Sequence, residues 1–286
     1  METRKLVKTG ADTYTVSIPK NWIISNNLKK GDILYLYGNA NTLSICPVTE
    51  RSDKIKEITI QIDDKDIGTI RRETIAAYMN NNHVFTFVGK TLNKKVSELH
   101  QILDNFLALE IQEQTDTKIV AKDFLNLQEF SLKNTIRRMD MLTRGMLSDA
   151  KISSNAESLE FRDFEVDKNL FLISRIVRGS FISKSGGMDD FNYWNMAKNI
   201  ERISEAAKSV CALMDKKSLP FYEKLENYYK DAITAFFKED KKAADQLIAQ
   251  KLKLTDENDA MKSDIKIFFK EIIVNTRNIA KIVLDS

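Results

Sequence analysis

The sequence predicts a multidomain α+β protein in which short strands come first and long helices come last. Chain-breaking residues support this order: residues 10–47 hold three Gly and two of the three Pro, residues 90–144 hold neither, and residues 188–286 hold only Pro220. The spacing of apolar residues also changes, from a period of about two near the start to about 3.6 toward the end. Strands and turns are therefore expected in the first part of the chain, and helices in the last.

Residues 1–48 form the first predicted domain. Polar and apolar residues alternate from Thr13 to Ile18, Gly31 marks a turn, and further strands are expected at 33–37 and 42–46. Each strand has a single apolar face, and a unit of this size buries too little surface to fold alone. We therefore expect this domain to dimerise.

The spacing of apolar residues changes twice within residues 53–127, which predicts a small βαβαβ linking domain. No GxxxxGK or GxGxxG motif occurs there, so nothing supports a nucleotide site. The expected strands are 58–62, 84–88 and 118–124, and the expected helices are 66–80 and 96–114.

Residues 128–286 predict an all-α domain of six helices with short links, either one bundle or a pair of three-helix bundles end to end. In the third helix, apolar residues recur at spacings of three and four from Met196 to Met214, and Cys211 is expected in the core. Breaks are expected at 184–187 and 219–220. The helices are 128–153, 155–183, 189–217, 220–239, 241–261 and 263–285.

Cysteine and histidine are scarce, with only Cys46, Cys211, His83 and His100 in the chain. This excludes Cys-rich zinc sites and HExxH metalloproteases, and a disulfide framework is not expected. No apolar run approaches the ~20 residues that cross a bilayer, and the start of the chain has no apolar signal segment. We expect a cytoplasmic protein that is not embedded in a membrane.

The net charge of +3 lies entirely in the first domain, because residues 1–48 contain six basic and three acidic residues and the rest of the chain balances. A positive N-terminal domain would attract a polyanion such as DNA. The alternative is a charge that serves solubility alone.

The second and third predicted helices each carry two carboxylates at spacing i, i+4: Asp163 and Asp167, and Glu201 and Glu205. Their angular positions lie on the flank of the apolar stripe or opposite to it, so we expect a cluster on the outer surface. One interpretation is a solvated acidic face. The basic residues available to relieve its charge are Arg162, Lys168 and Arg202.

The other interpretation is a metal site. If the two helices pack side by side, up to four carboxylates converge, and such oxygen ligands favour Fe, Mn, Mg or Ca over zinc. The Glu-x-x-His motif of ferritin-like di-iron proteins is excluded, because neither His lies in the helical domain.

Residues 1–48 resemble the AbrB/SpoVT family of swapped-hairpin DNA-binding domains. The resemblance is carried by a strand, Ile18-Pro19-Lys20, a short helix, the Gly31-Asp32 turn and paired strands, in that order. It implies an intertwined dimeric β-barrel that sets a basic face on double-stranded DNA. The residues that would contact phosphate are Arg4, Lys5, Lys8 and Lys20.

Residues 128–286 resemble PhoU, the phosphate-signalling regulator built from two three-helix repeats. The stretches 163–175 and 199–208 are similar to its two acidic-motif helices, with Glu205 where Asp is usual. The resemblance implies surface carboxylates that bind multinuclear metal clusters, and a role in coupling phosphate transport to gene control.

The second repeat departs from the family. Aligning 279–283 with 206–210 places Val274 and Asn278 where the first repeat has Glu201 and Glu205, so a second cluster lacks its ligands. In the fifth helix, three acidic residues do not form the i, i+4 pair: Asp256, Glu257 and Asp259. The combination of an AbrB-like head and a PhoU-like body resembles an archaeal arrangement.

Together these resemblances imply a homodimeric DNA-binding regulator of phosphate uptake, not an enzyme. The alternative is a PhoU-type interaction module that binds a phosphate transporter or a sensor kinase, with the head serving only to dimerise. Metal-assisted hydrolysis at the carboxylates ranks third, because the sequence shows no general base for it.

Overall fold

Two units make up the chain, Met1–Lys54 and Ile55–Ser286. The structure is a computed structural model that describes residues 3–38, 43–47, 55–127, 130–152, 156–182, 186–261 and 263–285. The first predicted domain, 1–48, lies within the first unit. Of the segment predicted as a linking domain, 53–127, residues 55–127 belong to the same unit as the helices.

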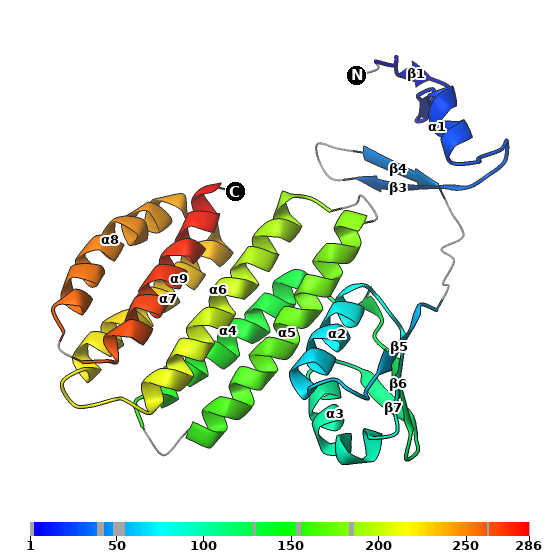
Figure 1. Cartoon of the computed structure of the whole chain (residues 1–286). Coiled ribbons are helices and arrows are strands. Elements are labelled where there is room, and N and C mark those ends of the chain that lie inside the picture. Colours follow the sequence, from blue (N-terminus) through cyan, green and yellow to red (C-terminus); the bar gives the residue numbers. More distant parts are fainter. Residues whose placement is uncertain are drawn as a thin grey trace. The chain divides into compact units, whose positions relative to one another are not determined.

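The first unit consists of two antiparallel hairpins and one short helix (Figure 1). Strand β1 (Val7–Lys8) pairs with β2 (Tyr14–Thr15), and β3 (Leu34–Gly38) pairs with β4 (Leu43–Pro47). Helix α1 (Lys20–Ser25) lies between them in sequence. The strand predicted at 42–46 therefore corresponds to β4, with Thr42 outside the described residues.

The described side chains of the first unit form no buried core. None of those at 3–36, 43, 45 and 47 is buried. Large apolar side chains that would form a core are instead exposed, and an isolated fold gains no stability from apolar surface left in water. These side chains are Leu6, Val7, Tyr14, Val16, Ile24, Ile33, Tyr35, Leu36 and Leu43.

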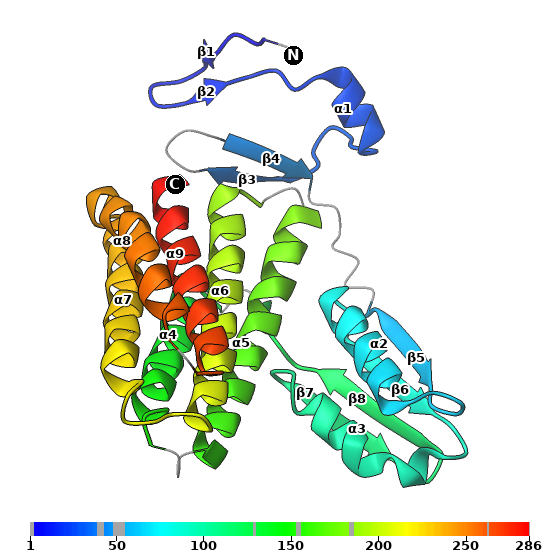
Figure 2. The same ribbon diagram turned by 60° about the vertical axis from the view of Figure 1, so that its left-hand side comes forward.

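The second unit begins with a four-stranded mixed sheet in the order β5-β6-β8-β7. Strand β5 runs parallel to β6, and the other pairs are antiparallel. Helices α2 and α3 cover one face of the sheet (Figure 2). The elements are β5 (Glu57–Gln61), α2 (Ile67–Met79), β6 (Val84–Val88), α3 (Val96–Leu103), β7 (Leu109–Gln114) and β8 (Lys118–Asp123).

The prediction of a single helix over 96–114, and with it the βαβαβ order, is wrong. Helix α3 ends at Leu103, and Leu109–Gln114 forms a fourth strand that pairs with β8. Between them Ala108 adopts a left-handed conformation, with φ of 58°. This turn reverses the chain so that Leu109 is buried under the helices as a strand residue.

The six predicted helices are present, with ends that differ by a few residues. Helix α6 packs against α4, α5 and α9, and α9 also packs against α7 and α8. All six share one hydrophobic core, which includes Cys211, so the two sets of three helices are not separate bundles end to end. The helices are α4 (Leu132–Asp149), α5 (Ala156–Ile182), α6 (Met188–Cys211), α7 (Leu219–Lys238), α8 (Lys241–Asp259) and α9 (Lys266–Asp285).

A buried arginine anchors the sheet region to the helices. Arg175 of α5 is 1% exposed and its Nη2 donates to the Asp123 carboxylate at 2.5 Å. Its Nε donates to Asn81 Oδ1 at 2.8 Å, and its guanidinium lies 4.4 Å from the centre of the Tyr78 ring. A guanidinium this far from water needs these partners in fixed places, so the sheet region and α5 are held together.

None of the helices in the described ranges combines the length and apolarity that crossing a bilayer would take.

Candidate functional site

The packing of α5 against α6 brings the two predicted carboxylate pairs together into one group, Asp163, Asp167, Glu201 and Glu205, which we call the carboxylate cluster. Each pair stands on one helix face because its members are one turn apart. The charges of the other three carboxylates all act on Glu201 and raise its pKa, so the four lie within electrostatic range of one another.

The cluster is more buried than the sequence predicts. Asp163 is only 8% exposed, Asp167 and Glu201 are partly buried, and Glu205 alone is exposed. The expectation of an outer-surface cluster is therefore wrong for Asp163. The angular position of a residue on its own helix does not include its neighbours, and α5 is also covered by α2, α4 and α6.

Lys208 is a member of the site that the sequence analysis missed. Its ammonium forms an ion pair with Asp163, which also accepts a hydrogen bond from Ser204 Oγ at 3.1 Å. Lys208 stands seven residues after Glu201, two turns along the same face of α6. That spacing was the signal that could have identified it.

Only one of the three basic residues expected to relieve the cluster does so. Arg202 pairs with Glu205 at 3.3 Å and lies 3.8 Å from Glu201. The other two pair outside the cluster, Arg162 with Asp149 at 2.5 Å and Lys168 with Glu165 at 3.0 Å.

Burial and mutual repulsion disfavour the charged forms of two members. Burial, followed by the charge of Asp163, raises the pKa of Asp167 to about 6. Burial, followed by the charge of Asp167, raises the pKa of Glu201 to about 7. Positive charge placed nearby would lower both pKa values again, because it favours the charged form of a carboxylate.

The donor chemistry of the cluster fits a hard cation. Its ligands are all carboxylate oxygens, which suit Fe, Mn or Mg better than zinc. In the side-chain positions of the described ranges, however, no three carboxylate, His or Cys groups are placed to hold one ion. Because Asp163 is already paired with the Lys208 ammonium, an ion would be held by Asp167, Glu201 and Glu205. These three side chains would have to turn toward it.

No family model, curated protein or solved structure matches this chain.

The four residues predicted to contact DNA are all exposed. Lys8 lies in β1, opposite Tyr14 of β2, and Lys20 is the first residue of α1. In the described part of the chain, Lys5, Lys8 and Lys20 make no ion pair, so their charges are available to an external anion. Arg4 is likewise exposed.

The acidic residues that the sequence analysis names in the second repeat, Asp256, Glu257 and Asp259, all lie in α8. Val274 and Asn278 lie in α9. On α8, Glu257 pairs with Lys224 at 2.6 Å.

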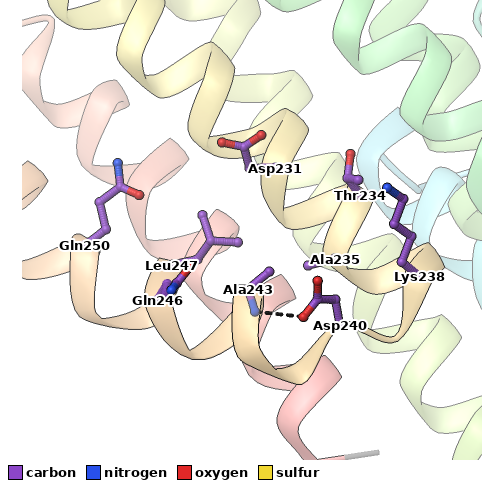
Figure 3. Close-up of a pocket in the computed structure, with 9 residues that line it drawn as sticks. All are labelled: Asp231, Thr234, Ala235, Lys238, Asp240, Ala243, Gln246, Leu247 and Gln250. Carbon is purple, nitrogen blue, oxygen red and sulfur yellow. Dashed lines mark hydrogen bonds between the residues drawn. The ribbon is translucent and has the colours of Figure 1, made fainter.

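A pocket of about 280 Å³ lies between α7 and α8 (Figure 3). At its edge the Asp240 carboxylate accepts a hydrogen bond from the Ala243 N–H at 2.9 Å. Asp240 therefore caps the start of α8, which is a structural task. We therefore place the candidate functional site at the carboxylate cluster rather than at this pocket.

Proposed function

We propose that this protein is a homodimeric DNA-binding regulator of the phosphate response. The first unit would bind double-stranded DNA, and the helical region would sense a cue at the carboxylate cluster. The observation that carries the proposal is the combination, in one unit, of an uncovered apolar surface and exposed basic residues. The resemblances to AbrB/SpoVT domains and to PhoU support it.

Dimerisation follows from the exposed apolar side chains of the first unit. A second copy would cover them, as the interleaved hairpins of the AbrB/SpoVT family imply. Two copies would also double the basic surface and present it to the regularly spaced phosphates of a duplex. This pairing gives the unit both its core and its DNA-binding face.

The helical region would act as the sensor. When bound, a hard cation such as Fe, Mn or Mg supplies a fixed positive charge. Asp167, Glu201 and Glu205 would hold it, and Lys208 would keep Asp163 neutralised. Burial and the charge of Asp163 raise the pKa of Asp167, and the charge of Arg71 of α2 lowers it, so α2 lies within electrostatic range of the cluster. We place this regulator in the cytoplasm.

Duplex binding by the full chain at low and moderate salt tests the proposal. Because released counterions drive binding to phosphates, affinity is expected to fall steeply as salt rises. Changing Lys5, Lys8 and Lys20 to Gln together should weaken binding at least about tenfold and flatten the salt dependence. The control changes Lys216 and Lys217, two exposed lysines of the helical region, to Gln and should alter binding little.

Absence of salt-sensitive duplex binding would overturn the proposal. The alternative, an interaction module for a phosphate transporter or sensor kinase whose head only dimerises, would then take its place.

A further inference from the structure

Further along α5 and α6 from the carboxylate cluster, these helices and α2 form an open pocket of about 470 Å³. Met79 of α2, four residues of α5, and Phe191 and Trp194 of α6 line it. The Trp194 Nε1–H donates to Ser174 Oγ of α5 at 3.2 Å, so the indole is held across the two helices. The pocket thus has an ordered aromatic wall.

The apolar surface extends beyond the pocket. Phe181 and Phe191 are 47% and 43% exposed, and at the same ends of α5 and α6 both Ile182 and Met188 are 67% exposed. Contiguous exposed apolar side chains mark interaction sites on proteins. Because this surface continues past the pocket, it suits a chain segment better than a small molecule.

Among the described residues, one charged side chain lines the pocket, and it is basic. An acidic residue lies beside the pocket: Asp190, next to Phe191, accepts a hydrogen bond from Ser180 Oγ at 2.7 Å. Arg178 is exposed, lines the pocket and makes no ion pair within the described residues. Lys198 places its ammonium 4.6 Å from the centre of the Trp194 ring. No carboxylate lines the pocket among the described residues. An occupant with acidic groups beside its apolar side chains would complement these charges.

We propose that this pocket binds an amphipathic helix of a partner protein that carries bulky apolar side chains on one face and acidic residues beside them. A helix laid into a groove between helices presents its apolar residues at spacings of three and four. Its apolar side chains would fill the space between Met79 and Trp194, and its carboxylates would meet Arg178 and Lys198. This inference does not depend on DNA binding or on a metal.

The test uses the full chain with Trp22→Phe, which leaves Trp194 as the single tryptophan. Two synthetic helical peptides of about 16 residues share one leucine stripe, and one carries Glu where the other carries Lys. The Glu peptide is expected to shift the emission of Trp194 and to bind at least about tenfold more tightly than the Lys peptide.

Two variants locate the binding. Arg178→Glu should reverse the preference between the peptides, and Phe191→Ala should weaken the Glu peptide about tenfold or more. The matched control is Phe161→Ala, an exposed aromatic residue of α5 that does not line the pocket, and it should have no effect. These positions are exposed or half-exposed, so the fold is expected to persist, and a thermal melt verifies it.

Equal binding of the two peptides, binding of neither, or equal effects of Phe191→Ala and Phe161→Ala would overturn the proposal. Binding to anionic phosphatidylglycerol vesicles without binding to the Glu peptide would overturn it in favour of a lipid surface. Duplex binding by the same variants is measured in parallel. A failure of peptide binding with intact duplex binding then separates this proposal from the proposed function.

Discussion

Glu201 is a partly buried carboxylate surrounded by the charges of three others, and its pKa of about 7 follows from this position. The folded protein therefore holds a proton on Glu201 at pH values where the unfolded chain, with a pKa near 4.5, has lost it. The folded state binds more protons in this window, so the free energy of unfolding falls as pH rises from about 4.5 to 7.

Replacing Glu201 by Gln should remove the contribution of Glu201 to this dependence on pH. We expect E201Q to raise the free energy of unfolding by about 1–2 kcal/mol at pH 8, with little change at pH 4.5. Urea unfolding at the two pH values measures the effect. The control E205Q changes an exposed carboxylate and should give a smaller gain, and equal gains from the two variants would contradict this account.

Metal binding at the cluster can be measured directly. If Glu201 and Glu205 hold a hard cation, changing both to Ala should remove most of the metal that copurifies with the protein. Elemental analysis of the wild type and the double variant gives the answer. Unchanged metal content would take these two residues out of the site and leave the cluster as a charged face balanced by Lys208 and Arg202.

Strand β7 is the element on which sequence and structure differ most. Leu109 and Ile111 fit the apolar spacing of a helix that continues from α3 as well as that of a strand, because short apolar runs satisfy both periods. The turn at Ala108 decides between them. The left-handed residue of this turn is alanine and not glycine, so the local sequence does not indicate a turn there.

The turn at Ala108 predicts an unusual response to glycine. Because a left-handed alanine carries a strain of about 1 kcal/mol, Ala108→Gly should leave the free energy of unfolding unchanged or raise it slightly. Ala108→Val should lower it by more than 1 kcal/mol, on the order of the cost of a branched residue at positive φ. Chemical denaturation measures both.

Ala76, an exposed residue inside α2, provides the matched control. There glycine should cost about 1 kcal/mol, as in any helix interior. Equal losses at Ala76 and Ala108 would show that the turn carries no strain.

At the scale of the whole molecule, the two units differ in what can hold them together. The unit Ile55–Ser286 has two hydrophobic cores of its own, one under the sheet and one among the helices. The described residues of the first unit bury nothing. Within a single copy, the buried apolar surface that stabilises the fold therefore belongs to the second unit. The exposed apolar side chains of the first unit need a partner molecule to bury them.

Removing residues 1–54 should thus leave a folded protein but change its oligomeric state. We expect residues 55–286 alone to be monomeric with undiminished helical circular dichroism per residue, and the full chain to be dimeric. Light scattering coupled to size-exclusion chromatography distinguishes the two. A dimer that persists without residues 1–54 would place the interface in the helical region.

The six helices, the positions of most strands and the identity of the four carboxylates could be predicted from the sequence by itself. The spacing of apolar residues and the positions of Gly and Pro determine secondary structure through near neighbours in the sequence, so they can be interpreted without the fold. Only the tertiary structure decided that Asp163 is buried, that Lys208 rather than Lys168 neutralises it, and that Arg175 joins the sheet region to α5. Each of these depends on which helix faces meet, and residues far apart in the chain determine that together.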